Sequence, residues 1–242
     1  TQVFDGQGQP QRPQRVIILE EDLEIAPDFF EFFGALASAL DTDETLLAVS
    51  AWNDNGMESN VKDPEMLYRS DFFPGLGWMM PRRLWEEFGP KWPRGYWDDW
   101  IREPPQRKGR ETIRPEICRT FHFGEHGTSN AQYSSYLRNI KLNDRHIPFS
   151  HLDLSYVLNG EAYRHDFLRK VLAAKLIKPQ ALIVGKGFNQ GEEVQITYAG
   201  IAEFARIAKQ LKIMDNEKAG IPRTAYKGVV PFWYQGTRVY LR

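Results

Sequence analysis

Glu20-Glu21-Asp22 ends the apolar run Val16-Ile17-Ile18-Leu19, and Pro27-Asp28-Phe29-Phe30 begins a helical pattern soon afterwards. An apolar, β-branched run followed by charge predicts a buried strand that carries three carboxylates at its C-terminal end. In open α/β sheets, ligands bind in the crevice beyond such strand ends, and oxygen ligands suit a hard divalent cation such as Mg²⁺ or Mn²⁺. The alternative is that the acids only solvate a turn and favour the positive end of the next helix.

The composition narrows the class of protein. The 242 residues allow one large domain or two small ones, and we favour two. The 31 basic and 32 acidic residues leave a net charge of -1, which gives no general attraction to nucleic acid. A single cysteine, Cys118, excludes an internal disulfide. Because no apolar run is long enough to cross a bilayer, we expect this stretch of chain to be soluble.

The first part of the chain has the strand and helix alternation of an α/β layer. Residues 1–14 are rich in Gln, Gly and Pro and lack periodicity, which predicts a flexible arm. Hydrophobic periodicity then predicts strands at 16–19 and 46–50 and helices at 27–40 and 81–88. Trp52-Asn53-Asp54-Asn55 places polar groups after the second strand as well. We therefore expect two neighbouring strands to form a cleft with their polar ends.

A helical period is expected at 161–176, and a β-rich pattern without acid clusters follows it. The expected elements are strands at 181–184 and 194–198, a helix at 201–211, and a hairpin of strands 229–234 and 238–241. We predict an α/β catalytic portion at 15–142, a linker at 143–160 and a small α+β domain at 161–242.

Asp98 and Asp99 form a second acidic site within Tyr96-Trp97-Asp98-Asp99-Trp100. Charged groups among aromatic rings need partners, so one carboxylate can act as a base while the other caps or anchors. Of the five arginines that follow, we expect one or two to clamp a ligand and the others to be structural. These arginines are Arg102, Arg107, Arg110, Arg114 and Arg119.

Two further segments are consistent with a binding site. Gly75 and Gly77 would let the backbone approach a ligand closely, although a packed glycine turn is an equal alternative. Residues 125–130 are small and polar and suit an ordering lid. His122 and His126 are expected to be hydrogen-bonded scaffolding and are left out of the metal shell.

Several motifs in one order resemble glycosyltransferase family 13. The motifs are Leu19-Glu20-Glu21-Asp22-Leu23, Ser50-Ala51-Trp52-Asn53-Asp54, Phe72-Phe73-Pro74-Gly75-Leu76-Gly77-Trp78, Lys91-Trp92-Pro93, Trp97-Asp98-Asp99-Trp100, Arg114-Pro115-Glu116-Ile117 and Gly220-Ile221-Pro222-Arg223. The resemblance implies a GT-A type, Rossmann-like fold. It also implies Mn²⁺-dependent transfer of N-acetylglucosamine from UDP-GlcNAc to a mannose-terminated glycan on a glycoprotein, with inversion, at the lumenal face of the Golgi membrane.

The resemblance also implies roles for individual residues. Asp22 would ligate the metal, and Glu20 and Glu21 would contact the donor sugar, the ribose or the waters of the metal. Asp98 would be the general base. The remaining two expected donor-binding residues are Trp97 and Ser129.

Two departures from the family pattern bear on these expectations. The triplet is Glu-Glu-Asp, as in the family branch that acts on protein O-mannose, whereas the N-glycan branch has Glu-Asp-Asp. The family also places several strand and helix units, and a transmembrane anchor, before the triplet. We therefore expect this sequence to be a fragment of a longer protein, with weak donor binding if it stands alone.

Three hypotheses of different classes follow. The first is the transferase, acting on an N-glycan or on protein O-mannose. The second is a glycan-binding remnant that lacks a working donor site. The third is a glycoside hydrolase that uses Asp98 and Glu20 as an acid and base pair, which is disfavoured because the triplet suits a cation.

Overall fold

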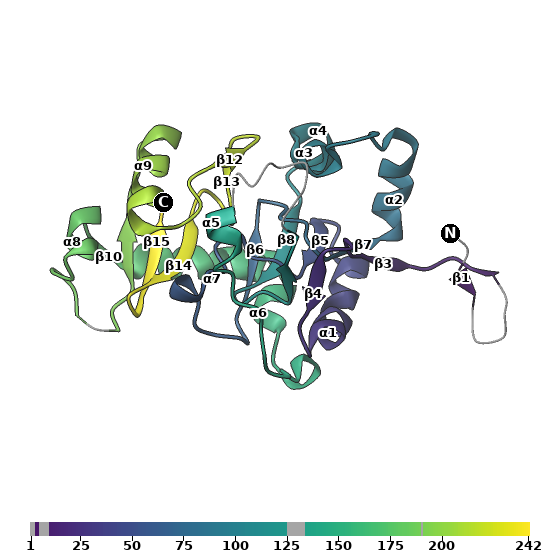
Figure 1. Ribbon diagram of the computed structural model, residues 1–242, viewed down its shortest axis with the longest axis horizontal. Helices are drawn as coiled ribbons and strands as arrows, with labels where there is room; N and C mark the ends of the chain where they lie inside the picture. The colour runs from purple at the N-terminus through teal and green to yellow at the C-terminus, as the bar shows by residue number, and fades with distance from the viewer. Residues whose placement is uncertain (1–2, 5–9, 125–133, 190) are drawn as a thin grey trace.

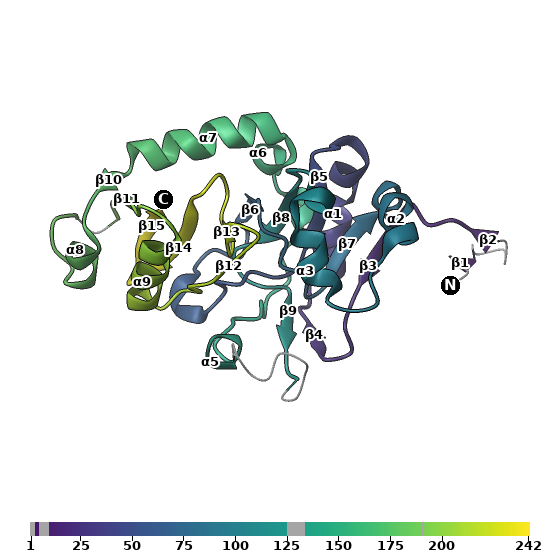
Figure 2. The same ribbon diagram turned by 90° about the horizontal axis from the view of Figure 1, so that it is seen from above.

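The computed structural model describes residues 3–4, 10–124, 134–189 and 191–242. In these residues the chain forms a mixed α/β fold with two main sheets, shown in Figure 1. Figure 2 shows the same arrangement from above, with helix α7 running along one side of the molecule.

The larger sheet has five strands in the order β3-β7-β5-β8-β6. Only β5 and β8 pair in parallel, and the other neighbours are antiparallel. The strands are β3 (Arg15–Ile18), β5 (Leu46–Ser50), β6 (Leu67–Ser70), β7 (Trp78–Pro81) and β8 (Glu111–Pro115). The expectation that the strands at 16–19 and 46–50 are neighbours is wrong, because β7 lies between β3 and β5.

Strand β3 is at the edge of this sheet, and no described strand pairs with its outer side. Val16 is 43% exposed and Leu19, just after the strand, is 45% exposed. The apolar run at the start of the acidic motif is therefore only partly buried.

Helix α1 (Phe29–Thr42) covers one face of the sheet, as Figure 1 shows below the strands. The helical spacing of Phe29, Phe33, Leu36 and Leu40 places all four side chains in the core, where each is at most 1% exposed. Asp28 does not cap the helix with its side chain. It instead forms a fully buried ion pair with Arg119, at 3.1 Å.

Short helices lie above the other face of the sheet in Figure 1. They are α2 (Arg82–Phe88), α3 (Trp97–Arg102) and α4 (Pro104–Arg107), with the 3₁₀ helix η2 (Gly89–Lys91) between the first two. Phe88 and Ile101 from these helices are buried against Trp78 and Met80 of β7 in a second apolar cluster.

The smaller sheet has four strands in the order β10-β11-β15-β14. The strands are β10 (Lys175–Leu176), β11 (Val194–Ile196), β14 (Val230–Tyr234) and β15 (Thr237–Leu241). The predicted hairpin is confirmed, since β14 and β15 pair antiparallel across Gln235-Gly236. The predicted helix at 201–211 is confirmed as α9 (Ile201–Leu211).

The strand expected at 181–184 is wrong, because these residues belong mostly to helix α8 (Pro179–Ile183). Pro179 occupies the first turn, where its fixed φ favours a helix start. A short apolar run does not by itself distinguish a strand from a helix, and the preceding proline decided the outcome.

The remaining elements connect these layers. They are β1 (Val3–Phe4), β2 (Pro10–Gln11), β4 (Leu23–Ile25), β9 (Thr120–His122), β12 (Glu217–Lys218), β13 (Ile221–Pro222), η1 (Glu58–Asn60), α5 (Ser134–Leu137), η3 (Phe149–His151), α6 (Ser155–Leu158) and α7 (Gly160–Ala173). β1 pairs with β2 within the expected arm, β4 with β9, and β12 with β13, all antiparallel.

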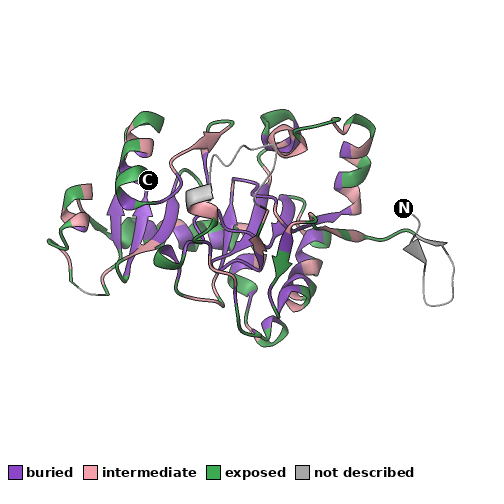
Figure 3. Ribbon diagram, in the orientation of Figure 1, coloured by how far each residue is buried: buried purple, intermediate pink, exposed green. Residues whose placement is uncertain are grey.

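The buried core continues across the linker expected at 143–160. One apolar cluster joins Phe33 and Leu36 of α1 to Phe167 of α7 and to Tyr240 of β15. A further apolar cluster joins Trp52 and Cys118 to the strands and helix of the smaller sheet. Figure 3 shows buried residues running through both sheets and exposed residues on the outer helices. The division into two domains stays a prediction.

Candidate active site

The acidic triplet lies in the turn between β3 and β4. Glu21 is exposed, whereas Glu20 and Asp22 are half-buried. Glu20 Oε2 accepts a hydrogen bond from the backbone N–H of Gly77, with a donor to acceptor distance of 3.3 Å. Burial raises the pKa of Glu20 and the nearby charge of Asp22 raises it further, although backbone hydrogen bonds oppose both effects. Glu20 therefore holds its proton to a higher pH than an exposed glutamate does.

Gly77 needs to be glycine for a steric reason. Its φ is +83°, and a Cβ atom there would lie 2.7 Å from Cγ2 of Thr120 and 3.5 Å from Cδ1 of Leu19. Its carbonyl oxygen accepts a 2.7 Å hydrogen bond from the N–H of Ala51. The close approach at Gly77 is therefore to the protein itself, and the packed glycine turn is the alternative that the structure supports.

Asp22 is beside His122 because β4 and β9 pair, with Leu23 opposite His122. His122 Nε2 lies 3.0 Å from Asp22 Oδ2. A Cβ atom at Gly124 would collide with the same carboxylate oxygen. His122 is therefore an interacting neighbour of Asp22, and its place outside the metal shell stays a prediction. His126 lies outside the described residues.

The side chains around Asp22 are consistent with a cation site in which a bound substrate supplies some of the metal ligands. The described part of the chain has no group of three or more His, Cys, Asp or Glu side chains that could hold a metal ion. Asp22 has 34% of its side chain exposed, so it is accessible from solution. Mg²⁺ and similar cations often use only one or two carboxylates together with water and substrate phosphates. Asp22 fits such a substrate-assisted site, and the described residues around it form no closed protein cage.

The second acidic site is on α3, where Asp98 and Asp99 share the guanidinium of Arg102. Arg102 Nη1 lies 2.7 Å from Asp98 Oδ2 and 3.0 Å from Asp99 Oδ1. Lys218 Nζ, from β12, lies 3.0 Å from Asp99 Oδ2. Burial raises the pKa of Asp99, but the hydrogen bonds and charges of Lys218 and Arg102 outweigh it, so the pKa of Asp99 is below its ordinary value. Asp98 has 42% of its side chain exposed and is accessible to a ligand.

Trp97 belongs to an aromatic cluster that holds the start of α3. Its ring stacks on Trp78 and on Trp92, with centroid distances of 5.6 and 5.9 Å. Phe73 packs edge-on to both Trp78 and Trp97. Two stacked neighbours fix the orientation of the Trp97 ring, which is half-buried.

The segment of residues 73–78 brings the two acidic sites into one region. Its Gly77 N–H contacts Glu20, and a Cβ atom at Gly75 would lie 3.8 Å from the ring of Trp97. The chain therefore places Glu20 and Trp97 along a common backbone segment, with Asp22 two positions after Glu20 and Asp98 next to Trp97 on α3. Ser129 lies outside the described residues.

The polar residues after β5 do not line this region, and the expectation that they help to form a cleft is wrong. Asn53, Asp54 and Asn55 are each at most 3% exposed. Asn53 donates to the carbonyl oxygen of Glu116, and Asp54 pairs with Arg223 at 2.6 Å. These side chains connect the larger sheet to the C-terminal part of the chain.

The sequence did not single out two residues of the region: Arg102, which was one of five candidate arginines, and Lys218. Arg102 follows Asp98 by four positions on α3, and this helical spacing of opposite charges could have identified the pair. Lys218 lies 119 positions from Asp99. No local pattern signals a contact at such a separation.

These features define a mixed α/β protein with carboxylates at the end of an edge strand and a second acidic pair on a nearby helix. The chain belongs to the GNT-I family, whose model matches residues 2–242. This match confirms the family that the sequence motifs indicated.

The particular relative found is an alpha-1,3-mannosyl-glycoprotein 2-beta-N-acetylglucosaminyltransferase of Arabidopsis thaliana. The two proteins are 52% identical over 225 residues, which are 93% of this chain and 50% of the relative. The chain thus spans about half the length of the curated relative that it matches.

Proposed function

We propose that the protein, in its full length, is an inverting transferase of GT-A type that moves N-acetylglucosamine from UDP-GlcNAc to a mannose of an N-glycan, in a β-1,2 linkage. The observation that carries this proposal is the 52% identity, over 93% of the chain, to a relative whose name gives a 2-beta-N-acetylglucosaminyltransferase that acts on an alpha-1,3-mannosyl glycoprotein. The match of the family model to residues 2–242 supports the same assignment.

On the donor side, Asp22 is the proposed ligand of a divalent cation, Mn²⁺. When bound, the cation neutralises negative charge that grows on the departing diphosphate. Glu20 and Glu21 are proposed to contact the donor sugar, the ribose or the waters of the cation. The half-exposed carboxylate of Asp22 supports this role, since a substrate-bound cation needs an accessible oxygen ligand.

On the acceptor side, Asp98 is the proposed general base. Its carboxylate takes the proton of the acceptor hydroxyl while that oxygen forms a bond to the anomeric carbon of the donor. The bond from that carbon to the phosphate oxygen breaks, and UDP leaves with the electron pair. One base and no enzyme nucleophile give inversion. Trp97 is proposed to contact the donor sugar. Ser129 is proposed to contact the donor from the segment that would close over it.

The acceptor class has two candidates. The name of the Arabidopsis relative gives an alpha-1,3-mannosyl glycoprotein as its acceptor, from which we infer the mannose of an N-glycan. The Glu20-Glu21-Asp22 triplet is the form that the family resemblance associates with protein O-mannose. Transfer assays with a mannose-terminated N-glycan and with an O-mannosyl peptide, run side by side, decide between them, and we expect the N-glycan to be used.

The proposed location is the lumenal face of the Golgi membrane. In the described parts of the chain, no helix has both the length and the apolar character that crossing a bilayer requires.

Calorimetric titration of the full-length protein with UDP and Mn²⁺ tests the donor side. We expect binding that Asp22→Ala abolishes and that Asp166→Asn leaves unchanged. Asp166 is a suitable control because its side chain is 57% exposed on α7, a helix with no residue in the proposed site.

A transfer assay tests the acceptor side. Asp98→Asn is expected to lower transfer by roughly 10²- to 10⁴-fold, the usual contribution of a general base, while UDP binding persists. Glycan binding that depends on neither the metal nor Asp98 would instead indicate a non-catalytic glycan-binding protein. Release of free sugar without a nucleotide donor would indicate a glycoside hydrolase.

A further inference from the structure

Arg102 connects both carboxylates of α3 to the backbone of a neighbouring segment. Its side chain is 6% exposed, and its Nη1 contacts Asp98 and Asp99 at 2.7 and 3.0 Å. Its Nε donates to the carbonyl oxygen of Phe73 at 2.9 Å, and its Nη2 to that of Pro74 at 3.3 Å. Because a guanidinium is planar and carries donors in fixed directions, these bonds define the position of Arg102 and of the carboxylates that it holds.

The same backbone segment continues to the donor-side carboxylates. The carbonyl oxygen of Gly75 accepts from the hydroxyl of Ser50 at 2.9 Å, and that of Leu76 accepts from Thr120 at 2.7 Å. The N–H of Gly77 then donates to Glu20. A short, hydrogen-bonded stretch of chain therefore runs from the partner of Asp98 to the partner of Glu20.

Lys218 adds a contact from the C-terminal part of the chain. The hairpin of β12 and β13 lies near α3 in Figures 1 and 2, and Lys218 Nζ is 3.0 Å from Asp99 Oδ2. Asp99 is thus neutralised from two sides. Without Lys218, Asp99 would compete more strongly with Asp98 for the single Nη1 of Arg102, because both carboxylates contact that atom.

Resting on the proposed transferase function, we infer that Arg102 is a positioning residue that sets the Asp98 carboxylate relative to the donor-side acids, and that Lys218 supports it through Asp99. Arg102 itself is not a reacting group, since its donors are directed at Asp98, Asp99 and two carbonyl oxygens. Removing Arg102 or Lys218 should therefore impair the acceptor side and spare the donor side.

The test compares Arg102→Gln with Arg110→Gln in the full-length protein, by transfer kinetics and by UDP and Mn²⁺ titration. Arg110 is a matched control, because it pairs with Glu87 and not with either aspartate of α3. We expect Arg102→Gln to lower kcat by about 100-fold, the scale of a small misplacement of a catalytic group, with KM for UDP-GlcNAc and UDP affinity little changed. Arg110→Gln should leave kcat within about twofold of the wild type.

A double-mutant cycle with Asp98→Asn decides whether Arg102 acts through Asp98. If it does, adding Arg102→Gln to Asp98→Asn causes no further loss beyond about twofold, because the group that Arg102 positions no longer functions. The same loss in both backgrounds would overturn the inference, and so would a loss of UDP affinity equal to the loss of kcat.

Lys218→Met provides a second test if Arg102→Gln does not fold. The Lys218 side chain is 39% exposed, so its replacement leaves the core intact. We expect kcat to fall by about two- to fivefold, the range of a partly exposed ion pair, and only when Asp98 is present. An unchanged kcat would overturn the role of Lys218, whereas absence of transfer by the wild type would overturn the proposed function itself.

Discussion

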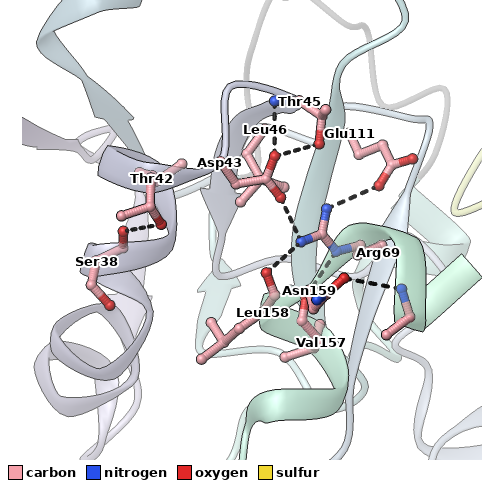
Figure 4. Close-up of polar contacts among 12 residues, drawn as sticks. Ser38, Thr42, Asp43, Thr45, Leu46, Arg69, Glu111, Val157, Leu158 and Asn159 are labelled. Atoms are coloured by element: carbon pink, nitrogen blue, oxygen red, sulfur yellow. Dashed lines mark hydrogen bonds and ion pairs between the residues drawn. The ribbon is translucent and has the colours of Figure 1, made fainter.

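Replacing Arg69 by methionine should destabilise the protein by about 3 kcal/mol, because the change leaves buried acceptors without their donor. The Arg69 side chain is 0% exposed. As Figure 4 shows, it donates to Asp43 at 2.7 Å and Glu111 at 3.1 Å, and to the carbonyl oxygens of Val157 and Leu158 at 2.8 and 2.9 Å.

The magnitude follows from what each acceptor retains. Breaking a buried ion pair by removing one partner costs about 3–5 kcal/mol. Asp43 keeps its hydrogen bonds from Thr45, and Glu111 keeps its ion pair with Lys227, so the cost should fall at the lower end of that range. A loss of this size is a large fraction of the 5–15 kcal/mol that stabilises a typical domain.

Urea denaturation followed by circular dichroism measures the effect, with Arg206→Met as the matched control. Arg206 forms only a surface pair with Glu203, in which the side chains are 57% and 40% exposed, so its loss should cost less than about 0.5 kcal/mol. A destabilisation by Arg69→Met that is no greater than that of Arg206→Met would refute the reasoning.

The same variant tests the predicted division into domains. Arg69 joins β6 to the α6–α7 region. The cluster around Phe33 and Phe167 and the cluster around Trp52 and Cys118 both contain residues from the two sides of the expected linker. We expect amide hydrogen exchange in α9 (Ile201–Leu211) to become faster along with exchange in β6. Unchanged protection of α9 would show that residues 161–242 fold as an independent unit.

Three other predictions concern single sites. The ion pair and hydrogen bonds of Glu116 outweigh its burial and lower its pKa. Its contribution to stability is therefore present above pH 4.5, its ordinary pKa, and is lost as the pH falls through the lower pKa of the folded state. Urea titrations at pH 7 and pH 3 should show a smaller pH dependence of stability in Glu116→Gln than in the wild type. Gly77→Ala should lower the free energy of unfolding by about 1–3 kcal/mol, because Gly77 has a positive φ and an added Cβ would meet Thr120. Gly95 has open space around it, so Gly95→Ala should lower it by less than about 1 kcal/mol. Thermal or urea denaturation measures both. Burial raises the pKa of Cys118 to about 12, so its thiol should not react with a thiol reagent at pH 8 until urea unfolds the protein, and rapid labelling of the native protein would contradict this.

Local sequence patterns predicted those elements whose apolar spacing is regular. The spacing of Phe29, Phe33 and Leu36 identified α1, and the paired runs around Gln235-Gly236 identified the β14–β15 hairpin. Strand β7 (Trp78–Pro81) was not predicted, because its four residues lie between a glycine-rich turn and a helix start. As a result, the order of strands beside the acidic triplet could not be deduced.

The candidate site was predictable only in part, because local patterns show which residues are adjacent in the sequence but not which distant residues meet in the fold. Acid clusters at Glu20 and Asp98 are visible in the sequence because the residues of each cluster are adjacent. The contacts that arrange them depend on the tertiary fold, as when Gly77 meets Glu20 across 57 positions. His122 reaches Asp22 only because β4 and β9 pair. Sequence patterns therefore located the chemical groups, and the chain topology determined their partners.

The position of residues 73–77 explains why a small backbone change there should affect both sides of the proposed reaction. The segment accepts hydrogen bonds from Arg102 at one end and donates one to Glu20 at the other. Since Arg102 holds Asp98, a shift of the segment would move the proposed base and a donor-side acid together. Aromatic packing of Phe73 against Trp78 and the glycine turn at Gly77 resist such a shift. In the proposed inverting transfer, the donor and the base lie on opposite sides of the reacting carbon. We therefore propose that these backbone contacts, together with the acidic residues themselves, hold that geometry.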